Sequence, residues 1–175
     1  MNWWLIGILL AVVATAAVID IRTHRIPNLL TFPSLLIALA LQFAFNGTSG
    51  LILGVLGMLV GVALFLLPFA LGGMGAGDVK LMAVAGAFLG PEGALWAALF
   101  SGLAGGVLVI IWGLVRGRLS RVFTRTASLV VAAVDPRKRE AAGGLPNIER
   151  DKGWTVPYGV AIACGVALSI WWRGI

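Results

Sequence analysis

The sequence predicts an all-α fold: a polytopic membrane helix bundle with six transmembrane helices plus a cytoplasmic interfacial amphipathic helix. Of the 175 residues, 60% are hydrophobic and only 11% are charged, and the mean hydropathy is +1.02. A soluble domain carries roughly a quarter charged residues, so this composition indicates an integral membrane protein. The charges also cluster between the apolar runs, as topology determinants do. A single membrane-embedded domain over residues 1–175 accounts for the chain.

The first apolar run, from Trp3 to Ile19, is close to the lower limit of ~17 residues for a spanning helix. A cleavable signal peptide is the alternative, but no Lys or Arg precedes the run. The polar segment 20–28 follows, and its two arginines mark it as cytoplasmic. Within it, His24 is expected to be a solvated loop residue, and Pro27 can begin the next helix.

Turns rich in glycine separate the next expected helices, which cover residues 29–45, 51–71, about 78–89 and about 94–115. The helix over 78–89 is short, because at 1.5 Å per residue it spans only about half of the hydrocarbon core. Either the outer turn at 90–93 dips inward, or the glycine loop that precedes the helix lies inside the bundle. Irregular backbone is tolerated there if protein or a water-filled cavity surrounds it.

A long polar loop over 116–153 is expected on the cytoplasmic side, with an amphipathic helix over 119–134 lying on the membrane surface. The sixth helix is expected from Trp154 to Trp172. In this threading every Lys and Arg except Arg173 lies on one side, so both termini are expected outside. The net charge of +6 therefore indicates a lipid bilayer rather than nucleic acid as the partner. The single cysteine, Cys164, permits no disulfide within the chain.

The chain is organised around the glycine-rich loop 72–77, which is followed by Asp78 and Lys80. Ionisable groups beside lipid are costly, so they point to a function. The only acid before this loop is Asp20, at the end of the first apolar run. Both carboxylates are expected at the cytoplasmic membrane face.

Two carboxylates that lie close together can share one proton, so that one acts as a base and the other as an acid. Such a pair can activate a water molecule against a peptide carbonyl without a metal or other cofactor. Helix-end charges predict that Asp20 holds the proton, because it follows a helix, and that Asp78 is ionised, because it opens one. Spacing alone leaves two alternatives open. The acids can also serve an ion path, or form salt bridges with Arg22, Arg25 or Lys80.

Three motifs resemble the type IV prepilin peptidases, which are intramembrane aspartyl proteases. Residues 75–80, Gly-Ala-Gly-Asp-Val-Lys, match the family's Gly-x-Gly-Asp-x-Lys motif. Asp20 followed by Ile-Pro-Asn at 26–28 matches the segment of the first aspartate, and residues 156–161 resemble the Pro-Tyr-Gly stretch that opens the last helix. The resemblance implies that Asp20 and Asp78 are catalytic. It implies a loop-shaping or substrate-positioning role for a second set: Gly75, Gly77, Lys80, Pro27 and Asn28.

The resemblance further implies a prepilin or pseudopilin substrate, no cofactor, and a location in a prokaryotic inner membrane. Bifunctional members carry a cysteine-bearing domain linked to methyl transfer, and no such cysteines are present here. We therefore expect the short, peptidase-only form, similar to those of Flp-type tight-adherence pilus systems. The alternative from another class is a small ion-coupled transporter or channel that uses Asp20 and Asp78.

Overall fold

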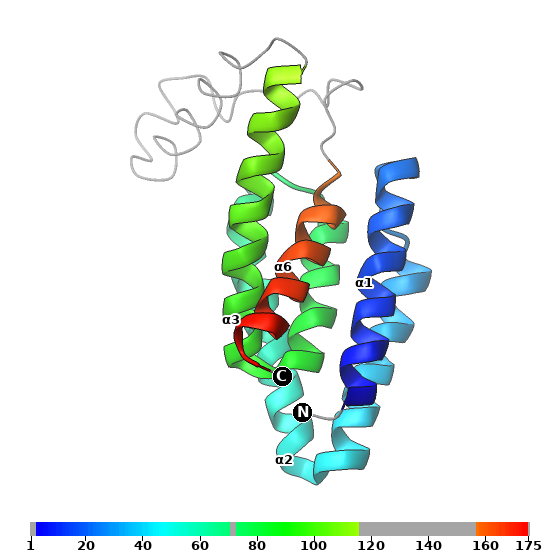
Figure 1. Cartoon of the computed structure of the whole chain (residues 1–175). Helices are drawn as coiled ribbons and strands as arrows, with labels where there is room; N and C mark the ends of the chain where they lie inside the picture. Colours follow the sequence, from blue (N-terminus) through cyan, green and yellow to red (C-terminus); the bar gives the residue numbers. More distant parts are fainter. Residues whose placement is uncertain (1–2, 71–72, 116–156, 175) are drawn as a thin grey trace, which may run out of the picture.

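The computed structural model describes residues 3–70, 73–115 and 157–174, and it arranges them as a helix bundle (Figure 1). The four helical elements are α1 (Trp3–Thr23), α2 (Asn28–Ala70), α3 (Ala76–Val115) and α6 (Tyr158–Trp172). The helices α1, α2 and α3 are long and apolar enough to cross a membrane, whereas α6, with 15 residues, is shorter. The predicted all-α membrane helix bundle is thus confirmed for this part of the chain, with three long helices and a short one.

Both α2 and α3 contain a sharp kink at a glycine. Gly47 in α2 has φ 62° and Gly90 in α3 has φ 73°, a region of backbone space that disfavours side chains with a Cβ atom. At Gly47 the chain reverses direction, so that α2 forms a helical hairpin (Figure 1). In α3, Pro91 directly follows the kink, where its fixed φ suits the first turn of a new helical segment.

The predicted helix ends need several corrections. The helices expected over 29–45 and 51–71 are the two arms of α2, which meet at the kink at Gly47 with only a one-residue break in helical geometry. The helix expected to begin at 78 begins at Ala76, inside the glycine loop. The last helix begins at Tyr158 rather than at 154, and residues 154–156 lie outside the described part. The predicted loop 116–153 and its amphipathic helix over 119–134 also lie outside it.

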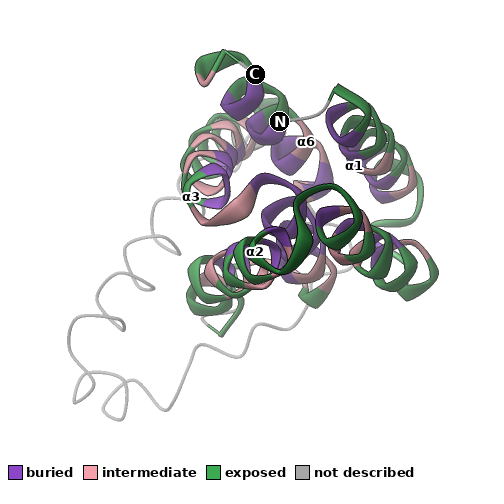
Figure 2. Ribbon diagram, turned by 90° about the horizontal axis from the view of Figure 1, so that it is seen from below, coloured by how far each residue is buried: buried purple, intermediate pink, exposed green. Residues whose placement is uncertain are grey.

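The centre of the bundle is the first half of α3, in which every residue from 81 to 89 is buried (Figure 2). The second half of α2 packs closely against it through glycines. A Cβ atom on Gly57 would overlap the backbone of Gly86 and Gly90, and one on Gly61 would lie 2.5 Å from the Met82 carbonyl oxygen. Small residues let helices in a membrane approach each other in this way.

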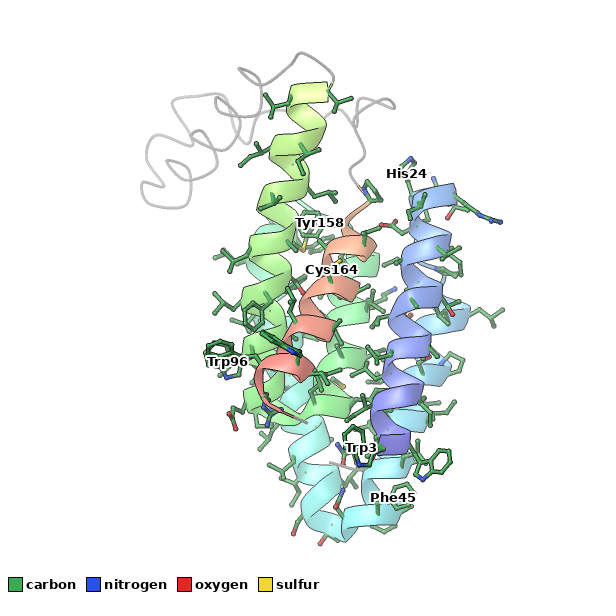
Figure 3. The ribbon with its side chains drawn as sticks, in the orientation of Figure 1. Trp3, His24, Phe45, Trp96, Tyr158 and Cys164 are labelled. Carbon is green, nitrogen blue, oxygen red and sulfur yellow. The ribbon has the colours of Figure 1, made fainter. Side chains whose placement is uncertain are left out.

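The two ends of the bundle differ. Both chain termini lie at one end, together with the Gly47 turn (Figure 1). Figure 3 places Trp3 and Phe45 toward that end and His24 and Tyr158 toward the other. The end that carries His24 is also where α1 ends and where α2, α3 and α6 begin, so it gathers the segments that the sequence motifs single out.

Candidate active site

Asp20 lies in the last turn of α1, which continues to Thr23. Its side chain is only 6% exposed. The backbone N–H of Gly159, in the first turn of α6, donates a hydrogen bond to Oδ2 of Asp20 over 2.8 Å. The first amide groups of a helix have no partner within the helix, and together with the helix dipole they favour a negative charge. Asp20 therefore lies at the electropositive start of α6.

Asp78 lies in the first turn of α3 and is 7% exposed. The N–H of Gly75 donates to Oδ2 of Asp78 over 2.9 Å, and the N–H of Asp78 donates to the Gly75 carbonyl oxygen over 3.1 Å. The Gly75 N–H group has no partner within α3, because Gly75 directly precedes the helix. The Asp78 carboxylate accepts this N–H group, as the third residue of a helix does in a capping box. The glycine-rich loop is thus ordered by the acid that follows it.

The two acids come from different helices and lie at the same end of the bundle, where α1 ends and α3 begins (Figure 1). Each carboxylate uses its Oδ2 atom to accept one backbone N–H at the start of a helix. In each, the Oδ1 atom accepts no hydrogen bond from the described residues. The structure therefore places both carboxylates, as the motifs led us to expect, at the same end of the bundle.

The expected loop-shaping residues join the segment after Asp20 to the segment around Asp78. Gly77 lies against Ile26, since a Cβ atom at Gly77 would be 3.0 Å from the Cβ of Ile26. Lys80 Nζ donates to Oδ1 of Asn28 over 2.7 Å. These contacts connect the start of α2 with the start of α3.

The other two expected loop residues, Pro27 and Gly75, form hydrogen bonds with residues close to them in the chain. The carbonyl oxygen of Pro27 accepts the N–H groups of Leu30 and Thr31, at 3.1 and 3.4 Å, and so begins α2. Gly75 is the residue whose N–H group contacts Asp78. The structure thus places all five expected residues at the end of the bundle that holds the two acids.

The salt-bridge alternative finds no support in the geometry. Among the described residues the one ion pair joins Arg173 and Glu92, at 3.6 Å. Arg22 and Arg25 are exposed and form no ion pair with Asp20. Lys80 points to Asn28 and lies 5.4 Å from the ring centre of Phe32, rather than on a carboxylate.

The predicted division of labour between the acids loses its basis. It assumed that Asp20 follows the first helix, but α1 continues through Thr23, and the N–H of His24 donates to the carbonyl oxygen of Asp20. Asp20 also accepts an amide from the start of α6, as Asp78 accepts one beside the start of α3. Asp20 therefore lies in the last turn of α1 but also at the electropositive start of α6, so helix-end charges no longer distinguish it clearly from Asp78. His24 itself is exposed, as expected, with φ 50°.

Sequence reasoning missed the contribution of α6. Gly159 contacts Asp20 directly, and its neighbour Tyr158 lies against Gly105 of α3, the helix that carries Asp78. The signal that could have found them was the Pro-Tyr-Gly stretch at 157–159, which was singled out by resemblance without a role. As to metals, no group of three or more potential ligands gathers within the described ranges.

An apolar helix bundle with two buried carboxylates at one end has the layout of a membrane-embedded aspartic hydrolase. A family model described as the type IV leader peptidase family matches residues 7–110, which is more than half of the chain. The chain therefore belongs to the type IV leader peptidase family. It is an aspartic-type prepilin peptidase and a multi-pass membrane protein, and its membership implies cleavage of prepilin leaders. The searches of curated proteins and of solved structures gave no match.

The matched segment contains Asp20, Asp78 and all five expected loop residues, whereas α6 lies beyond it. Membership in a peptidase family also removes the basis for the transporter alternative.

Proposed function

We propose that Asp20 and Asp78 are the catalytic pair of this peptidase, and that it removes the short basic leader of a type IV (Flp-like) prepilin at the cytoplasmic membrane face. The observation that carries the proposal is that two buried carboxylates, one from α1 and one from α3, lie at the same end of the bundle. The remaining acid in the described part, Glu92, is 71% exposed and pairs with Arg173 instead.

The chemistry follows from two acids that share one proton. The ionised carboxylate takes a proton from water as the water oxygen bonds to the peptide carbonyl carbon. The protonated carboxyl group donates to the carbonyl oxygen, on which negative charge develops. When the tetrahedral intermediate collapses, the C–N bond breaks and a proton from the pair passes to the departing amine. The products are the leader with a free carboxyl group and the pilin with a free amino group.

The hydrogen bonds at the site suit this chemistry. The amides of Gly159 and Gly75 hold Oδ2 of Asp20 and of Asp78, so each carboxyl group has a fixed orientation. The Oδ1 atoms remain for the water and for the substrate carbonyl. Reactive groups held in a fixed geometry lose less entropy when the transition state forms.

The loop residues are proposed to position the two acids relative to each other. Lys80 and Asn28 are hydrogen-bonded, and Gly77 allows Ile26 to approach closely. Gly75 and Pro27 order the starts of α3 and α2. The partly exposed Lys80 also provides a positive charge beside the site, although it contacts neither carboxylate in the structure.

Six membrane crossings are proposed for the chain. The 43 residues of α2 would span about 65 Å if straight, twice the hydrocarbon core of about 30 Å. The kinks at Gly47 and Gly90 divide α2 and α3 into two crossings each. With α1 and α6 this makes six and leaves both termini on one side. The exposed Trp3 and Trp4, at 78% and 80%, suit a membrane interface at that end.

The positive charges support a cytoplasmic site. Arg22, Arg25 and Lys80 lie at the end that carries the acids, where α3 ends and α6 begins, and the sequence between these two helices is rich in arginine and lysine. Cytoplasmic loops carry an excess of such residues. The Flp-like substrate is supported by the resemblance to Flp-type peptidases, and the proposed membrane is a prokaryotic inner membrane.

The proposal is tested by coexpressing the full chain with a Flp-like prepilin and, separately, with a pseudopilin. We expect Asp20→Asn and Asp78→Asn each to abolish leader removal, with the double variant no worse than either, because the acids act as a unit. Glu92→Gln is the matched control and should retain cleavage. Substantial cleavage by either single Asn variant would rule out the pair. Cleavage of the pseudopilin alone would instead rule out the Flp-like substrate and leave the pair intact.

A further inference from the structure

The first two residues of α6 contact both helices that carry the acids. In Figure 1, α6 lies between α1 and α3. Gly159 donates its N–H to Asp20 of α1. Its neighbour Tyr158 places its ring against Gly105 of α3, the helix that carries Asp78. The start of α6 therefore connects the two halves of the site.

Tyr158 is held by a contact that only glycine permits. A Cβ atom on Gly105 would overlap the Tyr158 hydroxyl oxygen and would lie 2.6 Å from its Cζ atom and 2.9 Å from its Cε1 atom. Both the hydroxyl edge and the ring of Tyr158 thus rest on the bare backbone of α3. A helix position that accepts an aromatic ring at this distance leaves no room for any other residue.

The first turn of α6 has no side-chain cap. Its N-cap position is Pro157, which has no N–H group and makes no side-chain capping hydrogen bond. The orientation of the Gly159 amide thus depends on how the first turn of α6 packs. The ring of Tyr158, one residue earlier, contributes to that packing through its contact with Gly105.

We propose that Tyr158 is a positioning residue of the peptidase: its ring, seated on Gly105, fixes the first turn of α6 so that the Gly159 N–H stays on Asp20. The proposal rests on the catalytic role of Asp20 and extends it to a segment beyond the matched family region. Tyr158 acts through Gly159 and Asp20, and it forms and breaks no bond itself.

The test uses the purified full chain in lipid and a prepilin substrate, with kcat and KM measured separately. We expect Gly105→Ala to lower kcat about 10- to 100-fold, because a misplacement of about 1 Å costs on that order. KM should change less than threefold, since the substrate-binding surface is not altered. Gly106→Ala is the first control. A Cβ atom there meets nothing within 4 Å, so its kcat should be unchanged.

Gly165→Ala is the second control, because it disturbs the same α3–α6 interface away from the site. A Cβ atom at Gly165 would overlap the Oγ and N atoms of Ser101. It should lower the thermal stability while the folded enzyme keeps its kcat. If Gly165→Ala lowers kcat as much as Gly105→Ala at the same loss of stability, Tyr158 has only a packing role and the proposal is overturned.

Variants of Tyr158 keep the test decisive if Gly105→Ala does not fold. Tyr158→Ala introduces no clash and should lower kcat as Gly105→Ala does. The double variant should be no slower than Tyr158→Ala alone, because the added methyl group would have no ring to displace. Tyr158→Phe keeps the ring and should restore most of the kcat that Tyr158→Ala loses.

Three results with the Tyr158 variants would overturn the proposal. Full kcat in Tyr158→Ala, or additive losses in the double variant, would overturn the proposal. So would a Tyr158→Phe variant as slow as Tyr158→Ala, since the hydroxyl group would then be the active feature. These results are distinct from a failure of the proposed catalytic pair, which would appear as an active Asp20→Asn enzyme.

Discussion

The backbone N–H of Gly159 donates a hydrogen bond to Oδ2 of Asp20 over 2.8 Å, across 139 positions in the chain. A Cβ atom on Gly159 would lie 3.0 Å from both the Cβ and Oδ2 atoms of Asp20. The close approach of α1 to α6 at this point therefore favours glycine, because any Cβ atom would have to displace the Asp20 side chain slightly. It also means that the orientation of one proposed catalytic acid depends on the last helix of the bundle.

This contact predicts the effect of Gly159→Ala. The added methyl group should push the Asp20 carboxyl group aside by a few tenths of an ångström and lengthen its hydrogen bond. We expect kcat to fall about tenfold, with little change in KM, because the substrate would still bind beside a misplaced acid. Gly102→Ala is the control, since a Cβ atom there meets nothing within 4 Å. An unchanged kcat in Gly159→Ala would show that Asp20 tolerates the shift.

The hydrogen bond between Lys80 Nζ and Asn28 Oδ1 gives a second prediction. Lys80→Met and Asn28→Ala should each lower kcat/KM, because each frees the start of α2 from the start of α3. A double-mutant cycle should give a coupling of about 0.5 to 3 kcal/mol, as for residues in direct contact. Arg22→Met removes an exposed cation at the same end and should not couple to Asn28→Ala. Strictly additive losses would mean that the hydrogen bond does not position the acids.

A third prediction concerns the packing of α2 on α3. Gly57→Ala and Gly86→Ala each place a methyl group against the backbone of the facing helix. Overpacking of this kind typically costs about 1 to 3 kcal/mol. We therefore expect lower thermal unfolding temperatures for both variants, measured in detergent. Gly7→Ala, whose Cβ atom meets nothing within 4 Å, should be as stable as the parent chain. Equal stability of all three variants would contradict the close helix contact.

The proposed six crossings give a fourth prediction, tested by labelling single cysteines in intact cells. In a Cys164→Ala background, Thr48→Cys should react with an impermeant thiol reagent added from outside, because Thr48 lies at the end opposite the acids. His24→Cys should react only after the cells are opened, since it lies at the proposed cytoplasmic end. Both sites are exposed, so a difference reflects the side of the membrane. The reverse pattern would invert the proposed topology.

Much of this architecture was predictable from the sequence. Long apolar runs identify the membrane helices, because a lipid environment requires apolar surface and satisfied backbone groups over the whole span. The turns at Gly47 and Gly90 were placed within the predicted turns 46–50 and 90–93, since glycine accepts the positive φ that a sharp reversal needs. The motifs also placed Asp20 and Asp78 at the same end, which the structure shows. Helix ends were less well predicted: α1 extends past Asp20, and α6 begins at Tyr158.

The sequence by itself therefore determined the class of the protein, the two buried acids and the glycines on which the loop depends. Only the tertiary structure decided what holds those acids. Backbone N–H groups orient both carboxylates, and every residue other than proline carries such a group, so residue identity does not reveal which one donates. Gly159 and Gly105 look alike in the sequence to glycines that face open space, such as Gly106. Their roles arise because α6 packs between α1 and α3, which brings segments from distant parts of the chain within hydrogen-bonding distance.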